Sequence, residues 1–85
     1  MIAIDANVLL RYLLQDDVVQ YEKAKNLIEN NTPVLITDVV LAETVWTLTG
    51  KRYNLNKPAI YNVVRSLIGD GAFHFESPQV IWSAL

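Results

Sequence analysis

The spacing of hydrophobic residues changes repeatedly along the chain, and each change predicts a new element of secondary structure. Short apolar runs at 2–4 and 34–36 predict two strands that are buried on both faces of a parallel sheet. A third strand is predicted at 73–75, where two phenylalanines flank His74 between a glycine turn and a proline. In that alternation His74 is expected on the solvent side of the strand.

Helical spacing of apolar residues predicts five helices between and after these strands. They are expected from Asn7, from Asp17 to about 30, from 37 or 38 to about 50, from Asn56 to 69, and from Ser77 onwards. The third of these helices has so few polar positions that we expect most of its surface to be buried, and Trp46 lies at core spacing, as does Trp82 in the last helix. The order β-α-α-β-α-α-β-α, with parallel strands and right-handed crossovers, indicates an α/β layer architecture.

The composition favours one packed domain over residues 1–85, since 52% of the residues are hydrophobic and only 3 are Gly and 3 are Pro. The chain has no cysteine and a single His74, which excludes disulfides, thiolate zinc sites and clusters of imidazole ligands. Any metal chemistry must therefore use oxygen ligands. The apolar stretches are too short to cross a membrane and no secretory leader is recognisable, so we expect a cytoplasmic protein.

Two acidic residues occupy positions where chemistry is plausible. Asp5 ends the first predicted strand, and ligands of open α/β sheets bind at the carboxyl ends of the strands. Alternatively, Asp5 only caps the helix that follows. Glu43 lies in the apolar third helix, where a buried carboxylate needs a partner or a metal. Alternatively, Glu43 marks a solvent-facing stripe together with Thr47 and Gly50.

Because the first two strands are expected to be parallel, the segments that carry Asp5 and Glu43 begin at the same sheet edge. Their carboxylates could converge there and bind a hard divalent cation such as Mg²⁺. The net charge of −2 argues weakly against a general nucleic-acid binder, yet residues 51–65 contain four basic residues and no acid. Of these, Lys51, Arg52 and Lys57 could contact RNA phosphates, or they could belong to a solvated surface.

Two segments resemble the first two motifs of PIN domains of the VapC toxin type: residues 4–17, IDANVLLRYLLQDD, and residues 40–46, VLAETVW. The resemblance covers the chain in order and spacing. It implies a three-layer α/β/α fold and an Mg²⁺- or Mn²⁺-dependent ribonuclease that an antitoxin protein neutralises. By this resemblance Asp5 and Glu43 are metal-binding, catalytic acids and Asn7 supports Asp5, whereas Ala6 departs from the family's usual Thr or Ser.

The resemblance also implies that part of the site is missing, because PIN domains supply further acids from an Asp-rich segment after the helix that begins near Pro78. We therefore expect a C-terminally incomplete PIN-like domain with weak metal binding and impaired cleavage. Asp38, Asp70 and Glu76 are better explained by a helix cap, a turn and a strand end than as substitute ligands.

An alternative hypothesis is a non-catalytic module that binds an antitoxin or self-associates. In the family's sheet the first strand is central, so its unpaired edge at 2–4 predicts a homodimer or a swapped assembly. A third possibility, that Asp5 accepts a phosphoryl group, is weaker because the sequence places neither the second acid cluster nor the lysine that this chemistry usually needs.

Overall fold

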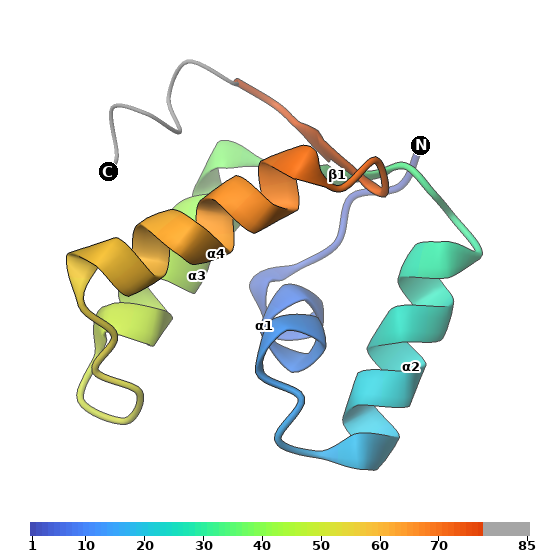
Figure 1. The fold of residues 1–85 in the computed structure, drawn as a ribbon. Coiled ribbons are helices and arrows are strands. Elements are labelled where there is room, and N and C mark those ends of the chain that lie inside the picture. Colours follow the sequence, from blue (N-terminus) through green and yellow to red (C-terminus); the bar gives the residue numbers. More distant parts are fainter. Residues whose placement is uncertain (78–85) are drawn as a thin grey trace.

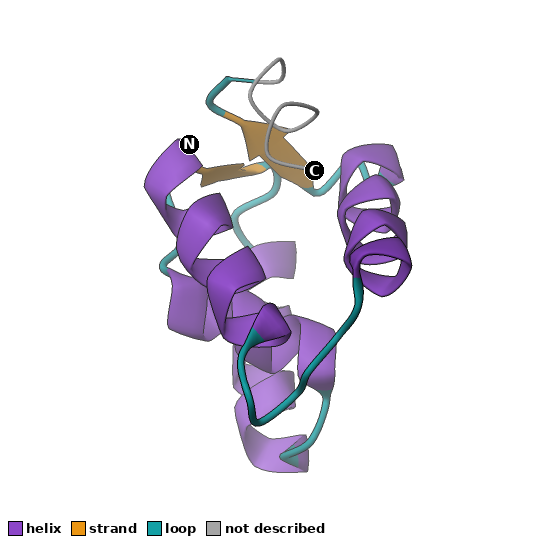
Figure 2. Ribbon diagram, turned by 90° about the vertical axis from the view of Figure 1, so that its left-hand side faces the viewer, coloured by secondary structure: helices purple, strands orange, loops and turns teal. Residues whose placement is uncertain are grey.

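Four helices and a small parallel sheet make up residues 1–77, the part of the chain that the computed structural model describes. The strands lie at one end of the molecule and the helices extend away from them (Figures 1 and 2). In chain order the elements are α1 (Ala6–Leu14), α2 (Val18–Glu29), β1 (Val34–Ile36), α3 (Asp38–Thr49), α4 (Lys57–Gly69) and β2 (Phe73–Phe75).

The sheet is parallel, as predicted, but its first strand is almost absent. β1 and β2 pair in parallel with Leu35 opposite His74. The segment before α1 contributes one isolated parallel bridge, between Ala3 and Leu35, in which the Ile4 N–H donates to the Leu35 carbonyl at 3.2 Å. The predicted strand at 2–4 is thus reduced to a bridge, and it lies next to β1 on the side away from β2.

The helices begin where the capping residues predicted them to begin. A backbone N–H three residues later donates to the side chain of each cap, at 3.1 Å for Asp17, 3.3 Å for Thr37 and 3.0 Å for Asn56. Pro58 lies in the first turn of α4, where its missing N–H costs no hydrogen bond. Each such cap typically stabilises its helix by about 1 kcal/mol.

The hydrophobic core lies between the sheet and the helices, and its residues follow the predicted periodicities. In β2 the two phenylalanines are buried and His74 is exposed, which confirms the predicted alternation. Tyr12 of α1 packs edge-on against Phe73, with ring centroids 5.7 Å apart. The core residues are Ile4, Leu9, Ile28, Val34, Ile36, Leu41, Leu48, Ile60, Val64, Leu67, Phe73 and Phe75.

The prediction that most of α3 is buried is wrong. Trp46 is 78% exposed and Val39 is 66% exposed, so Trp46 is not a core residue. α3 packs against α1 and α4, and only one stripe of it, with Leu41, Thr44 and Leu48, is buried. The apolar composition of α3 did not predict its burial correctly, because composition does not show how many other elements pack around a helix.

The last predicted helix, from Ser77 onwards, falls almost entirely on residues 78–85, and Trp82 with it lies outside the described residues. The three-layer order therefore stays a prediction, while the mixed α/β architecture agrees with a PIN-like fold. Within residues 1–77 none of the helices has the length and apolar character needed to cross a membrane.

Candidate functional site

Asp5 links the end of the first bridging segment to the start of α1. Its backbone is extended, and its Oδ1 accepts a hydrogen bond from the Val8 N–H at 2.8 Å, so Asp5 is the N-cap of α1. The capping role that the sequence suggested is thus confirmed. Among residues 1–77 no protein group hydrogen-bonds to Oδ2, and the residue is exposed. The carboxylate is therefore held in place through one oxygen and can offer the other to a ligand.

Glu43 lies on the exposed stripe of α3, as the second interpretation of the sequence predicted. Thr47, one turn later, is exposed as well, and its hydroxyl donates to the Glu43 backbone carbonyl at 2.9 Å. The Glu43 carboxylate makes no ion pair or hydrogen bond within the described part of the chain. It needs no buried partner, because water solvates it.

The helices that carry the two acids pack against each other. α1 follows the bridge at Ala3 and α3 follows β1, so both helices begin at the carboxyl ends of neighbouring parallel segments. Asn7 and Thr47 line one cleft between these helices. Asn7 is two residues beyond Asp5 and Thr47 is four residues beyond Glu43. The structure thus brings the neighbourhoods of the two acids together, while direct convergence of the carboxylates stays a prediction.

The other acids near this sheet edge have structural roles. Glu76, directly after β2, accepts a hydrogen bond through Oε1 from the Asp38 N–H at 2.9 Å, and it thereby ties the end of β2 to the first turn of α3. Asp38 itself is not the cap, because Thr37 takes that position. Asp70 accepts from the Ala72 N–H at 3.0 Å and closes a turn. In residues 1–77 no three acids, histidines or cysteines gather into a metal-binding group.

The carboxylates of Asp5 and Glu43 are of the ligand type that suits a hard divalent cation such as Mg²⁺. Mg²⁺ prefers oxygen ligands, keeps several waters, and is usually held by one or two carboxylates together with substrate phosphates. Both side chains are exposed, which leaves room for those waters. Asn7, which is also exposed, could support Asp5 through its amide.

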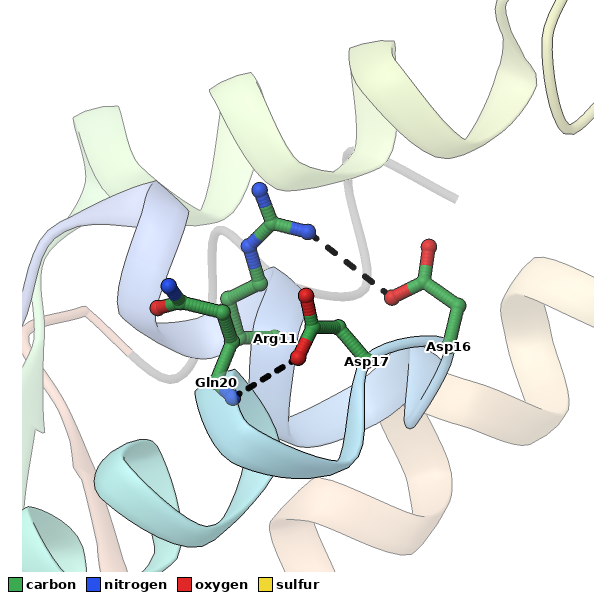
Figure 3. Close-up of polar contacts among 4 residues, drawn as sticks. All are labelled: Arg11, Asp16, Asp17 and Gln20. Atoms are coloured by element: carbon green, nitrogen blue, oxygen red, sulfur yellow. Dashed lines mark hydrogen bonds and ion pairs between the residues drawn. The ribbon is translucent and has the colours of Figure 1, made fainter.

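Two clefts flank the surface of α1 that follows Asp5, and both are lined by Asn7 and Arg11. The cleft toward α2 also contains Gln20 and Lys23, and the cleft toward α3 also contains Thr47, Arg52 and Tyr53. The guanidinium of Arg11 lies 3.8 Å from a carboxylate oxygen of Asp16. Figure 3 shows this ion pair, with Arg11 on α1.

Sequence reasoning did not single out Arg11. The signal was available, because Asn7 and Arg11 are four residues apart and share a helix face. Of the predicted RNA-contacting cations, Arg52 lines the second cleft and its guanidinium carbon lies 5.3 Å from the Tyr53 ring centroid. Lys51 and Lys57 are exposed and line neither cleft.

The phenol of Tyr12, on α1, has a pKa above its ordinary value. Burial raises the pKa of its phenol, and the negative charge of Asp70 raises it further. Tyr12 packs between Tyr21 and Phe73, so this shift reports on packing in the core.

A search with protein-family models adds one result to this geometry. The model of the PIN domain matches residues 2–80, a range that includes Asp5, Glu43 and all four helices. Comparison with curated proteins and with solved structures gave no match.

Proposed function

The chain belongs to the PIN domain family, and from this premise we propose that it is a Mg²⁺- or Mn²⁺-dependent endoribonuclease of the VapC toxin type. PIN domains are generally nucleases that use divalent metals. The proposal of RNA as the substrate and of an antitoxin as the partner goes beyond this family property. It rests on the resemblance of residues 4–17 and 40–46 to toxins of the VapC type.

One observation carries the proposal: α1 packs against α3, and one cleft between them is lined by Asn7, two residues beyond Asp5, and by Thr47, one helical turn beyond Glu43. Adjacent carboxylates repel each other, and a divalent cation relieves this repulsion. Asp5 is held by the Val8 N–H, so its free oxygen has a defined direction toward a ligand. Glu43 adds the second charge from the exposed stripe of α3.

In this proposal the residues of the chain bind and orient the cation and the substrate, and the cation would supply the electrophilic chemistry. When bound, it would lower the pKa of a bound water and stabilise negative charge on the scissile phosphate. Asp5 and Glu43 would fix the position of the cation relative to the cleft. Asn7 would hold the Asp5 side chain or contact the substrate from the first turn of α1.

Isothermal titration calorimetry with Mn²⁺ tests the metal assignment. We expect weak binding by the wild-type chain and at least about tenfold weaker binding by the double variant Asp5→Asn/Glu43→Gln, because two anionic ligands are lost. The matched control is Asp17→Asn/Glu22→Gln, which removes two exposed carboxylates from α2 and its cap and should leave Mn²⁺ binding unchanged. Equal binding by the wild type and the first double variant would rule out these ligands.

Cleavage of a labelled single-stranded RNA tests the activity. We expect slow, Mn²⁺-dependent cleavage by the wild type, and none by Asp5→Asn/Glu43→Gln. Cleavage that persists in the double variant would show that other residues carry the reaction.

A non-catalytic interaction module is the second candidate, and the exposed edge beside β1 favours it. Ile2 and Ile4 use their backbone groups toward Leu35, whereas the N–H and carbonyl of Ala3 have no backbone partner in residues 1–77. Met1 is 74% exposed at the same edge. Such an edge can pair with a strand of an antitoxin or of a second copy of the chain.

Sedimentation velocity tests self-association through this edge. A wild-type dimer that Ile2→Lys converts to a monomer is the expected result, because an edge lysine opposes strand pairing. A wild-type chain that stays strictly monomeric at high concentration would contradict self-association.

A further inference from the structure

The two clefts on either side of α1 share one wall, and that wall carries a cation. Asn7 and Arg11 stand four residues apart on α1 and line both clefts. Each cleft then has a further cation on its opposite side, Lys23 from α2 in one and Arg52 from the loop after α3 in the other. Three basic side chains from three different segments therefore line the two clefts beside α1.

The size and lining of the clefts indicate what they can bind. Their volumes of about 120 and 220 Å³ are smaller than the roughly 300–1,000 Å³ of ordinary small-molecule pockets. They suit single phosphate or sugar groups better than a whole small ligand. Amide and hydroxyl groups from Asn7, Gln20 and Thr47 add neutral hydrogen-bonding partners, and such groups commonly accompany arginine at phosphates.

Arg11 is positioned for this role although it already has an acidic neighbour. Its contact with Asp16 is 3.8 Å long, and both side chains are more than a third exposed, at 38% and 37%. An exposed pair of this kind contributes little to stability, so a phosphate can displace Asp16 at small cost. Arg52 is also exposed, and its contact with the Tyr53 ring leaves its guanidinium edge available for hydrogen bonds.

We propose that Arg11, with Arg52 and Lys23 on either side, forms a binding track for the phosphodiester backbone of single-stranded RNA across α1. The proposal rests on the ribonuclease function proposed above and deepens it, because Asn7, two residues beyond Asp5, lines both clefts of the track and a strand bound there would pass the start of α1. Among the cations of residues 51–65, the proposal assigns phosphate binding to Arg52 alone. Arg11 and Lys23 complete the track.

Fluorescence anisotropy with a labelled single-stranded RNA of about 12 nucleotides tests the track, since single-strand sites span about 4–16 nucleotides. The measurements are made in EDTA, so they do not depend on the metal site. At about 50 mM salt, Arg11→Gln/Arg52→Gln should bind about tenfold more weakly than the wild type, and the magnitude of its log–log salt slope should fall by about 1.4, or 0.7 for each lost phosphate contact. The control, Lys57→Gln/Arg65→Gln, removes the same charge from exposed positions of α4 and should keep the wild-type slope.

A second variant separates binding from a structural role of Arg11. Asp16→Asn breaks the same ion pair but leaves the cation in place, so RNA should bind about two- to threefold more tightly. If Arg11 acted only by holding Asp16, this variant would bind no better than the wild type. Circular dichroism of each variant confirms that it is folded.

Three results would overturn the track: no RNA binding by the wild type, an unchanged salt slope in Arg11→Gln/Arg52→Gln, or an equal loss in the control. These results are distinct from a failure of the nuclease proposal. If the wild type binds RNA through Arg11 and Arg52 but does not cleave it with Mn²⁺, the track stands and the nuclease assignment falls. If it cleaves RNA while the arginine variant binds normally, the nuclease stands and the track falls.

Discussion

Asp5 has two separable roles, as the N-cap of α1 and as a proposed metal ligand, and two substitutions can tell them apart. Asn caps helices about as well as Asp, so Asp5→Asn should keep the hydrogen bond to the Val8 N–H while removing the negative charge. Asp5→Ala removes both the cap and the charge. The two variants should therefore differ in stability without metal and agree in their loss of metal binding.

The magnitudes follow from the cap and from ligand linkage. Without metal, Asp5→Ala should lower the free energy of unfolding by about 1 kcal/mol, and Asp5→Asn by only a few tenths of that. For a domain of this size, about 1 kcal/mol corresponds to a Tm decrease of roughly 4–8 °C. A cation at 100 times its Kd adds about 2.7 kcal/mol to the wild type, and neither variant should gain this amount.

The matched control is Asp17→Ala, which removes the equivalent cap of α2. Its Oδ1 accepts from the Gln20 N–H at 3.1 Å, compared with 2.8 Å at Asp5, so the cap loss should be similar. Asp17 has no proposed metal role, and this variant should keep the full stabilisation by Mn²⁺.

Thermal unfolding followed by circular dichroism, with EDTA and with saturating Mn²⁺, measures all four proteins. Mn²⁺ stabilisation of Asp5→Asn equal to that of the wild type would refute Asp5 as a ligand. If Asp5→Ala and Asp5→Asn were equally stable in EDTA, the capping argument would be wrong.

Two further predictions concern packing and pH. Trp46→Gln should change the free energy of unfolding by about 0.5 kcal/mol or less, because Trp46 is 78% exposed. Leu48→Ala should lower the free energy of unfolding by about 2–5 kcal/mol, because Leu48 is only 2% exposed. Urea unfolding of both variants measures the difference. Tyr12 has a raised pKa in the folded chain, so folding favours its neutral phenol. Stability should then be intact below about pH 10 and fall as the pH rises through that value, and Tyr12→Phe should reduce this fall, as measured by unfolding at several alkaline pH values.

Local signals predicted most of the fold. The bounds of β1 and β2 agree with the apolar runs, and Asp17, Thr37 and Asn56 cap the helices that they were expected to begin. These features depend on neighbours a few residues away in the chain, and the sequence contains that information directly. The prediction of a full strand at 2–4 was wrong because a short strand depends on hydrogen bonds to neighbouring strands. Within residues 1–77 this segment pairs on one side alone.

Exposure was harder to predict than secondary structure. α3 is apolar enough for a fully buried helix, yet Val39 and Trp46 face outward, because burial depends on how many elements surround a helix. The same uncertainty affected Glu43, for which a buried and an exposed position were equally open before the structure placed it on the exposed stripe. Arg11 was overlooked for a related reason: the sequence shows that Asn7 and Arg11 share a helix face, but it does not show that this face lines a cleft formed with other segments.

The capping role of Asp5 would support its proposed role as a metal ligand. A carboxylate that moved freely would lose conformational entropy when it bound a cation, and the hydrogen bond from the Val8 N–H has already restricted it. The cap therefore holds one oxygen of the Asp5 carboxylate and leaves the other exposed, two residues before Asn7, which lines both clefts together with Arg11. The proposed metal ligand and the proposed phosphate ligand therefore belong to α1 and its cap, and hydrolysis of a phosphodiester would require the cation and the phosphate to meet beside this helix.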